Sequence, residues 1–145
     1  MEVAIRKASI QDAEIIADYN VKMALETEEL ALDPAIVLAG VYNVFNNPAK
    51  GFYLVAEDKE RVVACLMITF EWSDWRNATW WWIQSVYVHP DMRGQRVYKQ
   101  MYQYLKRQVR ANQSLCGLRL YVDKRNLRAQ NVCLLYTSPS PRDRT

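Results

Sequence analysis

Residues 84–105 constrain the fold more than any other part of the chain. An apolar, β-branched run ends at His89-Pro90, and we expect the strand to end there because proline cannot donate a ladder hydrogen bond. Beyond it, the residues of one helical face are Val97, Met101, Leu105 and Val109. Between strand and helix lies Arg93-Gly-Gln-Arg, whose backbone N–H groups meet the positive end of a helix dipole. This arrangement predicts a site for an anion, such as a phosphate-bearing ligand.

The order of the remaining patterns predicts an α/β domain. Hydrophobic alternation and capping residues predict a strand at residues 3–7, a helix opened by Ser9 and Asp12, and a second helix opened by Asp33-Pro34. Three antiparallel strands should follow at residues 51–57, 61–72 and 79–88, then a helix at 95–110, a strand at 117–122 and a helical pattern from Asn126. We therefore expect a mixed, mostly antiparallel sheet with helices on both faces.

Composition limits the class of protein. The chain has 145 residues, half of them hydrophobic, which suits one domain with one core. No apolar run approaches the roughly 20 residues of a membrane helix, and the N-terminus lacks a signal-peptide pattern. We expect a cytoplasmic protein that does not contact membranes. The cysteines Cys65, Cys116 and Cys133 have no metal-like spacing, and His89 is the only histidine, so we expect no metal site.

Charge is divided unevenly along the chain. Residues 1–92 contain 7 Lys/Arg and 14 Asp/Glu, a net charge of −7, whereas residues 93–145 contain 12 and 2, a net charge of +10. Two solvated faces would explain this division, and so would a basic surface for a phosphate-rich ligand beside an acidic one for a cationic partner. We do not expect nucleic-acid binding, because the aromatic residues have the pattern of a core rather than of a stacking platform.

The chain resembles the GNAT superfamily of acyl-CoA-dependent N-acetyltransferases from residue 3 to about residue 132. The resemblance rests on the element order, the strand end Val-Tyr-Val-His-Pro, the Arg-Gly-Gln turn, and the runs Glu26-Thr-Glu and Glu71-Trp-Ser-Asp-Trp-Arg-Asn. It implies the GNAT fold, with acetyl-CoA as cosubstrate.

The resemblance also implies where acetyl-CoA binds. The edge of the strand at Val86, Tyr87 and Val88 would pair with the pantetheine amides as an added strand does. The turn would hold the pyrophosphate through Arg93, Gly94, Gln95, Arg96, Val97 and Tyr98, and Asn126 would lie beside the pantetheine arm. Arg96 and Tyr98 stand where relatives have two small residues. The Cβ of Arg96, in place of glycine, must point away, and its guanidinium is available for a phosphate.

The predicted reaction is the attack of an amine on a thioester. Relatives often place a glutamate at the position of Gln84 as the base; glutamine cannot be a base, so Gln84 would orient water or the amine. Glu28 or Glu71 would supply negative charge for the ammonium, unless both are ordinary solvated carboxylates. Trp72 would stack on the acceptor, although tryptophans more often pack in a core.

The end of the chain departs from the family. Cys133 stands where many relatives have a tyrosine that protonates the thiolate, and the following Ser-Pro-Ser-Pro run is typical of disorder. We expect an acetyltransferase domain at residues 1–132 that lacks its last strands, followed by a non-native or disordered tail at 133–145 that resembles a translated sequencing adapter. Such a truncation would weaken folding and activity, because it leaves a sheet edge unpaired.

Two functions remain open from the sequence. The first is direct transfer of an acetyl group to the primary amine of a small molecule. The alternative is an acyl-CoA-binding module of the same fold with little or no turnover, which Gln84 and Arg96 favour. A homodimer through the tryptophan-rich strands is a further expectation.

Overall fold

The computed structural model describes residues 2–120. The chain forms β1 (Ala4–Lys7), a 3-10 turn η1 (Ile10–Asp12), α1 (Ala13–Glu28), α2 (Pro34–Asn46), β2 (Phe52–Asp58), β3 (Arg61–Ser73), β4 (Ala78–Val88), a second 3-10 turn η2 (Pro90–Met92), α3 (Val97–Arg110) and β5 (Leu115–Leu120). The predicted elements within these residues are all present, in the predicted order.

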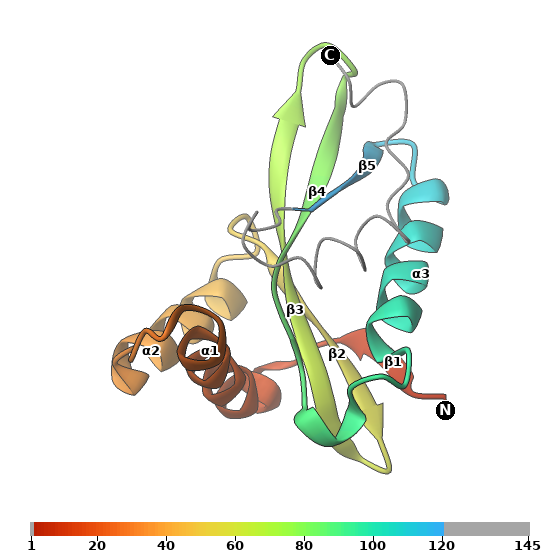
Figure 1. Ribbon diagram of the computed structural model, residues 1–145. Coiled ribbons are helices and arrows are strands. Elements are labelled where there is room, and N and C mark those ends of the chain that lie inside the picture. Colours follow the sequence, from red (N-terminus) through yellow and green to blue (C-terminus); the bar gives the residue numbers. More distant parts are fainter. Residues whose placement is uncertain (1, 121–145) are drawn as a thin grey trace.

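The strands form one mixed sheet in the order β1-β2-β3-β4-β5. Neighbours from β1 to β4 are antiparallel, and β4 and β5 are parallel because α3 connects them. Helices α1 and α2 cover one face of the sheet and α3 covers the other, while the long β3–β4 hairpin extends beyond α1 and α2 (Figure 1). The predicted α/β fold with a mixed sheet and helices on both faces is confirmed.

Each face of the sheet has its own hydrophobic core. On the α3 face, Met101 and Leu105 pack on Leu54, Leu66 and Ile83, and all five are at most 1% exposed. On the other face, buried residues of α1 and α2 pack on alternate residues of β2, β3 and β4. The members of this core are Ala13, Ile16, Ala17, Tyr19 and Val41 from the helices and Tyr53, Val55, Cys65 and Tyr87 from the strands. The two cores hold β4 rigidly in the middle of the molecule, so that its edge and both its faces are fixed in place.

The helix starts follow the predicted capping residues. Asp33 accepts a hydrogen bond from the Ala35 amide at 2.9 Å, and Pro34 is the first helical residue. Ser9 and Asp12 form a capping box, and both Asp12 oxygens accept hydrogen bonds from the Arg6 guanidinium, at 2.7 and 3.0 Å. The guanidinium holds the pKa of the Asp12 carboxyl below its usual value.

Two predicted boundaries were wrong by two residues. The third helix begins at Val97 rather than at residue 95, because Arg96 adopts the left-handed region at φ 63°. The last described strand begins at Leu115 rather than at residue 117, because its pairing with β4 starts at Thr79. Gly117 within this strand lies against the ring of Trp80, where an added Cβ would approach Cζ3 to 2.6 Å. The helical pattern from Asn126 and the predicted tail lie outside the described residues.

Candidate active site

A bulge interrupts β4 at the point where the strand leaves β5. The pairing of β3 with β4 shifts so that Ser85 and Val86 together face Leu66, and Ser85 adopts a left-handed φ of 53°. The bulge shifts by one residue the positions in β4 whose side chains point to the α3 face. Trp81 and Ile83 contribute to the α3 core before the bulge, and Val86 and Val88 do so after it.

Beyond the bulge, one edge of β4 is open as far as residues 2–120 are concerned. β5 pairs with β4 only from Thr79 to Ile83, so within residues 2–120 no strand borders the following residues on that side. The His89 amide donates to the Val63 carbonyl at 2.8 Å, and antiparallel alternation then turns the peptide groups of Val86 and Val88 away from β3. Their N–H and C=O groups face the open edge, which can therefore accept an extended ligand by strand addition.

The turn after β4 is shaped to bind an anion. Gly94 and Arg96 have left-handed φ values of 78° and 63°, and α3 follows immediately. The backbone N–H groups at the start of α3 have no partner within the helix, and they add to the positive end of its dipole. The first turn of α3 contains no acidic residue, so no carboxylate competes there with a bound anion.

Arg93 connects this turn to β4 and to α1. Its Nε donates to the Val88 carbonyl at 2.9 Å, and Nη2 donates to Glu26 Oε2 at 2.8 Å. Its guanidinium carbon lies 5.3 Å from the ring centre of Tyr87, whose hydroxyl donates to Glu26 Oε1 at 3.3 Å. Burial raises the pKa of the Tyr87 hydroxyl, which keeps this donor protonated.

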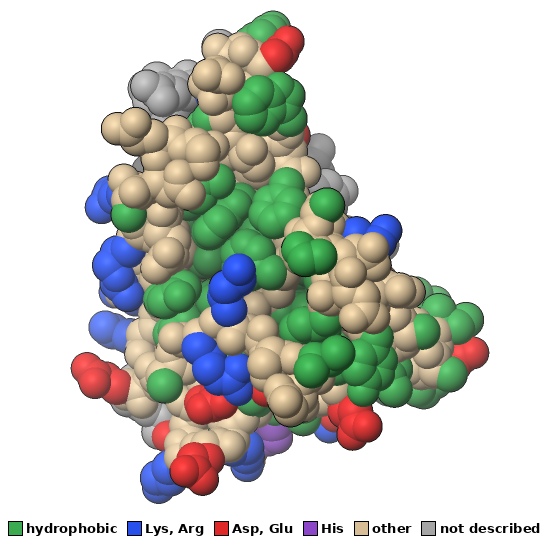
Figure 2. Space-filling model, turned by 180° about the vertical axis from the view of Figure 1, so that it is seen from behind, with side chains coloured by type: hydrophobic (Ala, Val, Ile, Leu, Met, Phe, Trp, Pro, Cys, Tyr) green, Lys and Arg blue, Asp and Glu red, His purple; other side chains and the backbone are tan. Residues whose placement is uncertain are grey.

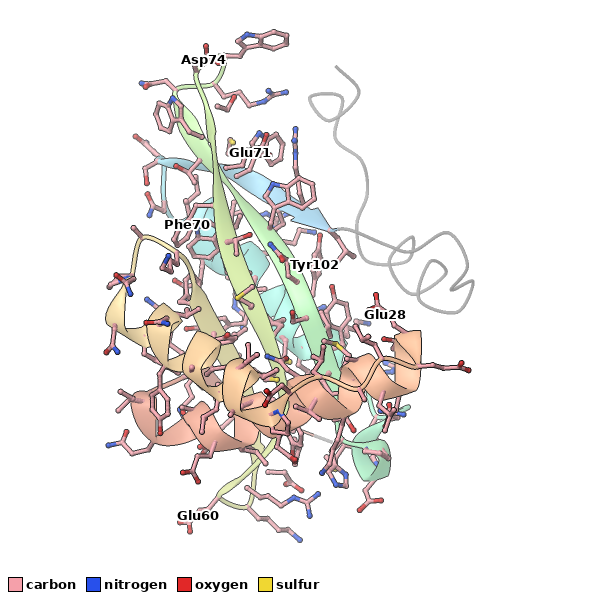
Figure 3. All side chains as sticks on the ribbon, turned by 90° about the vertical axis from the view of Figure 1, so that its left-hand side faces the viewer. Glu28, Glu60, Phe70, Glu71, Asp74 and Tyr102 are labelled. Atoms are coloured by element: carbon pink, nitrogen blue, oxygen red, sulfur yellow. The ribbon has the colours of Figure 1, made fainter. Side chains whose placement is uncertain are left out.

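Polar side chains line the sheet face that carries α1 and α2. Gln84 Nε2 donates to the Thr69 hydroxyl. Farther along the hairpin, Glu71 Oε1 accepts hydrogen bonds from Trp82 Nε1 at 2.8 Å and from Arg119 Nη1 at 3.0 Å. Figure 3 shows Glu71 on the part of the hairpin that extends past α1 and α2. A molecule that reaches β4 from this face therefore meets an amide, a hydroxyl and a carboxylate balanced by a guanidinium.

Comparison with known proteins identifies the family. The sequence matches the acetyltransferase (GNAT) family over residues 15–134. This protein belongs to the GNAT family. Among solved structures, a possible acetyltransferase from Clostridium difficile 630 is 35% identical, with a TM-score of 0.85 over 97% of this chain and 93% of the other. A predicted acetyltransferase from Clostridium acetobutylicum, solved with acetyl-CoA, is 18% identical, with a TM-score of 0.73 over 96% of this chain and 91% of the other. No curated protein matches the chain.

These matches define the activity at the level of the family. The protein is a GNAT acetyltransferase, for which acetyl-CoA is the typical cosubstrate and an acyl acceptor is required. They give no evidence for the predicted truncation after Val132 and do not support an inactive protein: the family match continues to residue 134, and 93% of the Clostridium difficile chain is covered.

The structure brings together some of the predicted site residues of this GNAT protein. Val86, Val88 and the turn from Arg93 to Tyr98 lie around the open edge of β4. The side chains of Gln84 and Glu71 lie on the sheet face that carries α1 and α2. Glu28 is exposed at the end of α1 (Figure 3). Asn126 lies outside the described residues.

Trp72 does not join the other predicted acceptor residues. It alternates with Glu71 along β3 and therefore points to the α3 face, where it is 62% exposed.

Hydrophobic side chains also gather in the middle of the molecular face seen in Figure 2. The predicted homodimer stays a prediction.

Sequence reasoning missed the bulge at Ser85 and the contacts of Glu26 and Arg119. The bulge has a signal in the sequence, since the apolar positions change from odd to even numbers between Ile83 and Val86. Glu26 and Arg119 have no comparable signal, because their partners are 67 and 48 residues away.

Within residues 2–120, no helix is long and apolar enough to cross a membrane. That part of the chain also holds no group of three or more His, Cys, Asp or Glu side chains placed to bind a metal ion.

Proposed function

We propose that this GNAT acetyltransferase transfers an acetyl group directly from acetyl-CoA to the primary amine of a small molecule. The observation that carries the proposal is the open edge of β4, which leads from the bulge at Ser85 to the anion-binding turn before α3. An extended arm ending in a pyrophosphate matches that sequence of backbone groups. The acetyl-CoA in the related Clostridium acetobutylicum structure supports the same ligand.

The chain offers backbone groups for each part of acetyl-CoA. Val86 and the Val88 N–H would pair with the pantetheine amides through the groups that face away from β3, while the Val88 carbonyl accepts from Arg93 Nε. The amides from Gly94 to Tyr98 would hold the pyrophosphate, and the Arg96 guanidinium would pair with a phosphate. Asn126 would lie beside the pantetheine arm.

Transfer requires a neutral amine and a polarised carbonyl. The amine nitrogen attacks the thioester carbon, a C–N bond forms and the C–S bond breaks; the nitrogen loses one proton, and the departing thiolate takes up one. Gln84 has no basic group, and its amide is held by Thr69, so its role would be to orient the amine or a water. Glu28 is exposed and bears a negative charge that would attract an ammonium.

Glu71 would act differently from a free carboxylate. Arg119 balances its charge at 3.0 Å, and Trp82 fixes the same oxygen. We therefore assign Glu71 a contact with the acceptor, through the second carboxylate oxygen, rather than proton abstraction.

Two measurements test this proposal. Acetyl-CoA should raise the melting temperature of the purified protein, because a ligand that binds only the folded state stabilises it. Thiol release should then follow the addition of a primary amine from a panel, and the same amine after N-methylation to a tertiary amine should give none. Binding without thiol release for any amine would favour a binding module, and the absence of both would contradict the proposal.

A further inference from the structure

We infer that Glu26 is a positioning residue for the acyl-CoA turn: it holds Arg93 across the end of β4 and thereby fixes the start of the turn. The inference rests on the proposed function. Glu26 lies in the last turn of α1, 67 residues before Arg93 in the sequence, yet its Oε2 accepts the Arg93 Nη2 hydrogen bond at 2.8 Å. The contact joins the helix of the acceptor face to the turn of the cofactor edge.

The Arg93 guanidinium is restrained by more than this ion pair. An exposed pair alone contributes little to stability, and both side chains here are about two-fifths exposed, at 41% and 43%. The same guanidinium also donates from Nε to the Val88 carbonyl at 2.9 Å and lies over the Tyr87 ring at 5.3 Å. The plane of a guanidinium is set when two of its nitrogens bond in different directions. Glu26 supplies the second of these directions.

The turn is also held by its neighbours: Met92 before it and Val97 after it are buried, at 6% and 2% exposed, and the Arg93 amide donates to the Pro90 carbonyl at 3.4 Å. Gly94 follows Arg93 with a φ of 78°, and among the described residues no atom beyond its two chain neighbours lies within 4 Å of the position that its Cβ would occupy. The hydrogen bond from Gln95 Nε2 to the Asp91 carbonyl is long, at 3.4 Å. The side-chain contacts of Arg93 add to these backbone restraints at the first residue of the turn, and the position of the backbone amides that follow depends on that residue.

The Glu26 carboxylate is itself fixed from the sheet. The Tyr87 hydroxyl donates to its other oxygen at 3.3 Å, and Tyr87 is only 4% exposed, stacked at 4.9 Å on Tyr19 of α1. Loss of the carboxylate would release Arg93 at one end while leaving the Val88 contact in place. The expected result is a turn with more freedom, which binds acetyl-CoA more weakly because ordering it costs entropy.

A double-mutant cycle on acetyl-CoA binding tests the inference. Glu26→Ala and Arg93→Ala should each raise the Kd of acetyl-CoA by about five-fold or more, measured by calorimetry, and the double variant should be no weaker than the weaker single variant. In turnover assays, Glu26→Ala should raise KM for acetyl-CoA while leaving kcat and the acceptor KM unchanged. Glu26→Asp should recover part of the affinity.

Glu14→Ala is the matched control. It removes an exposed carboxylate from the first turn of the same helix, and it should leave the Kd of acetyl-CoA unchanged. Additive effects of the two substitutions, an unchanged Kd for Glu26→Ala, or a raised acceptor KM in place of the acetyl-CoA KM would each overturn the inference. If the unaltered protein fails to bind acetyl-CoA, the proposed function fails instead, so the two failures are distinguishable.

Discussion

Arg96 occupies a backbone conformation that should cost stability, and two substitutions can measure that cost. With φ at 63° and ψ at 25°, it lies in the left-handed region immediately before α3. An L-residue with a Cβ pays about 1–2 kcal/mol there, while glycine pays about 0.5–1 kcal/mol in the entropy of the unfolded chain. Arg96→Gly should therefore be more stable than Arg96→Ala by about 1 kcal/mol, or about 3 °C in melting temperature.

The comparison isolates the backbone because both variants lose the same guanidinium. Unfolding in urea, monitored by tryptophan fluorescence in the absence of acetyl-CoA, gives the difference in free energy of unfolding between the glycine and alanine variants. An alanine variant as stable as the glycine variant would refute the argument, since it would show that no left-handed conformation is imposed at this position.

The same two variants also report on cofactor binding. If the Arg96 guanidinium pairs with a phosphate, both variants lose a charge-assisted contact of about 1.5–3 kcal/mol, which corresponds to about 10- to 150-fold in the Kd of acetyl-CoA. The glycine variant should then bind more tightly than the alanine variant, because glycine lets the backbone approach the phosphate more closely. Tighter binding by both variants than by the arginine protein would contradict the phosphate contact.

Two other predictions concern stability. Asp12→Asn should cost about 2 kcal/mol at pH 7, as expected for hydrogen bonds to charged groups. Arg6 lowers the pKa of Asp12 from its ordinary 3.8, so the stabilisation by the ion pair is complete above that pH and is lost as the pH falls through the folded-state pKa. Urea denaturation between about pH 2 and 7 should therefore show the free energies of unfolding of the two proteins converging in acid. A difference in free energy that does not change with pH would argue against the ion pair. Gly117→Ala should cost about 2 kcal/mol through overpacking against Trp80, 2.6 Å from the new Cβ. Gly40→Ala in α2 is its control, since beyond the helix's own backbone and the two neighbouring residues no described atom lies within 4 Å of the new Cβ. It should stabilise the protein by about 0.5–1 kcal/mol; equal melting temperatures for the two alanine variants would contradict the packing argument.

Much of the fold could be predicted from the sequence because local signals agree with one another. Asp33-Pro34 caps α2, the alternation of residues 61–72 matches β3, and Pro90 ends the pairing of β4. The turn between β4 and α3 was also predictable, since a short polar Gly-containing link between a strand and a helix leaves backbone donors at the helix start; anion binding there stays a prediction.

The candidate acceptor face was less predictable because its contacts come from residues far apart in the chain. Arg119 meets Glu71 only because β5 lies parallel to β4 beside Trp82, and no local pattern encodes that pairing. Trp72 and Glu71 are neighbours in the sequence, and alternation alone separates them onto opposite faces. A prediction based on proximity in the sequence therefore grouped them, and the strand geometry divides them.

The composition of α3 affects how fast an anion reaches the turn at its start. Its basic residues are Lys99, Lys106, Arg107 and Arg110, and it contains no Asp or Glu. A helix of one sign creates a field that extends about 10 Å into solvent at 0.1 M salt. The association rate of acetyl-CoA should therefore fall with ionic strength while its dissociation rate changes little, so the helix that covers one hydrophobic core also sets the frequency of productive encounters.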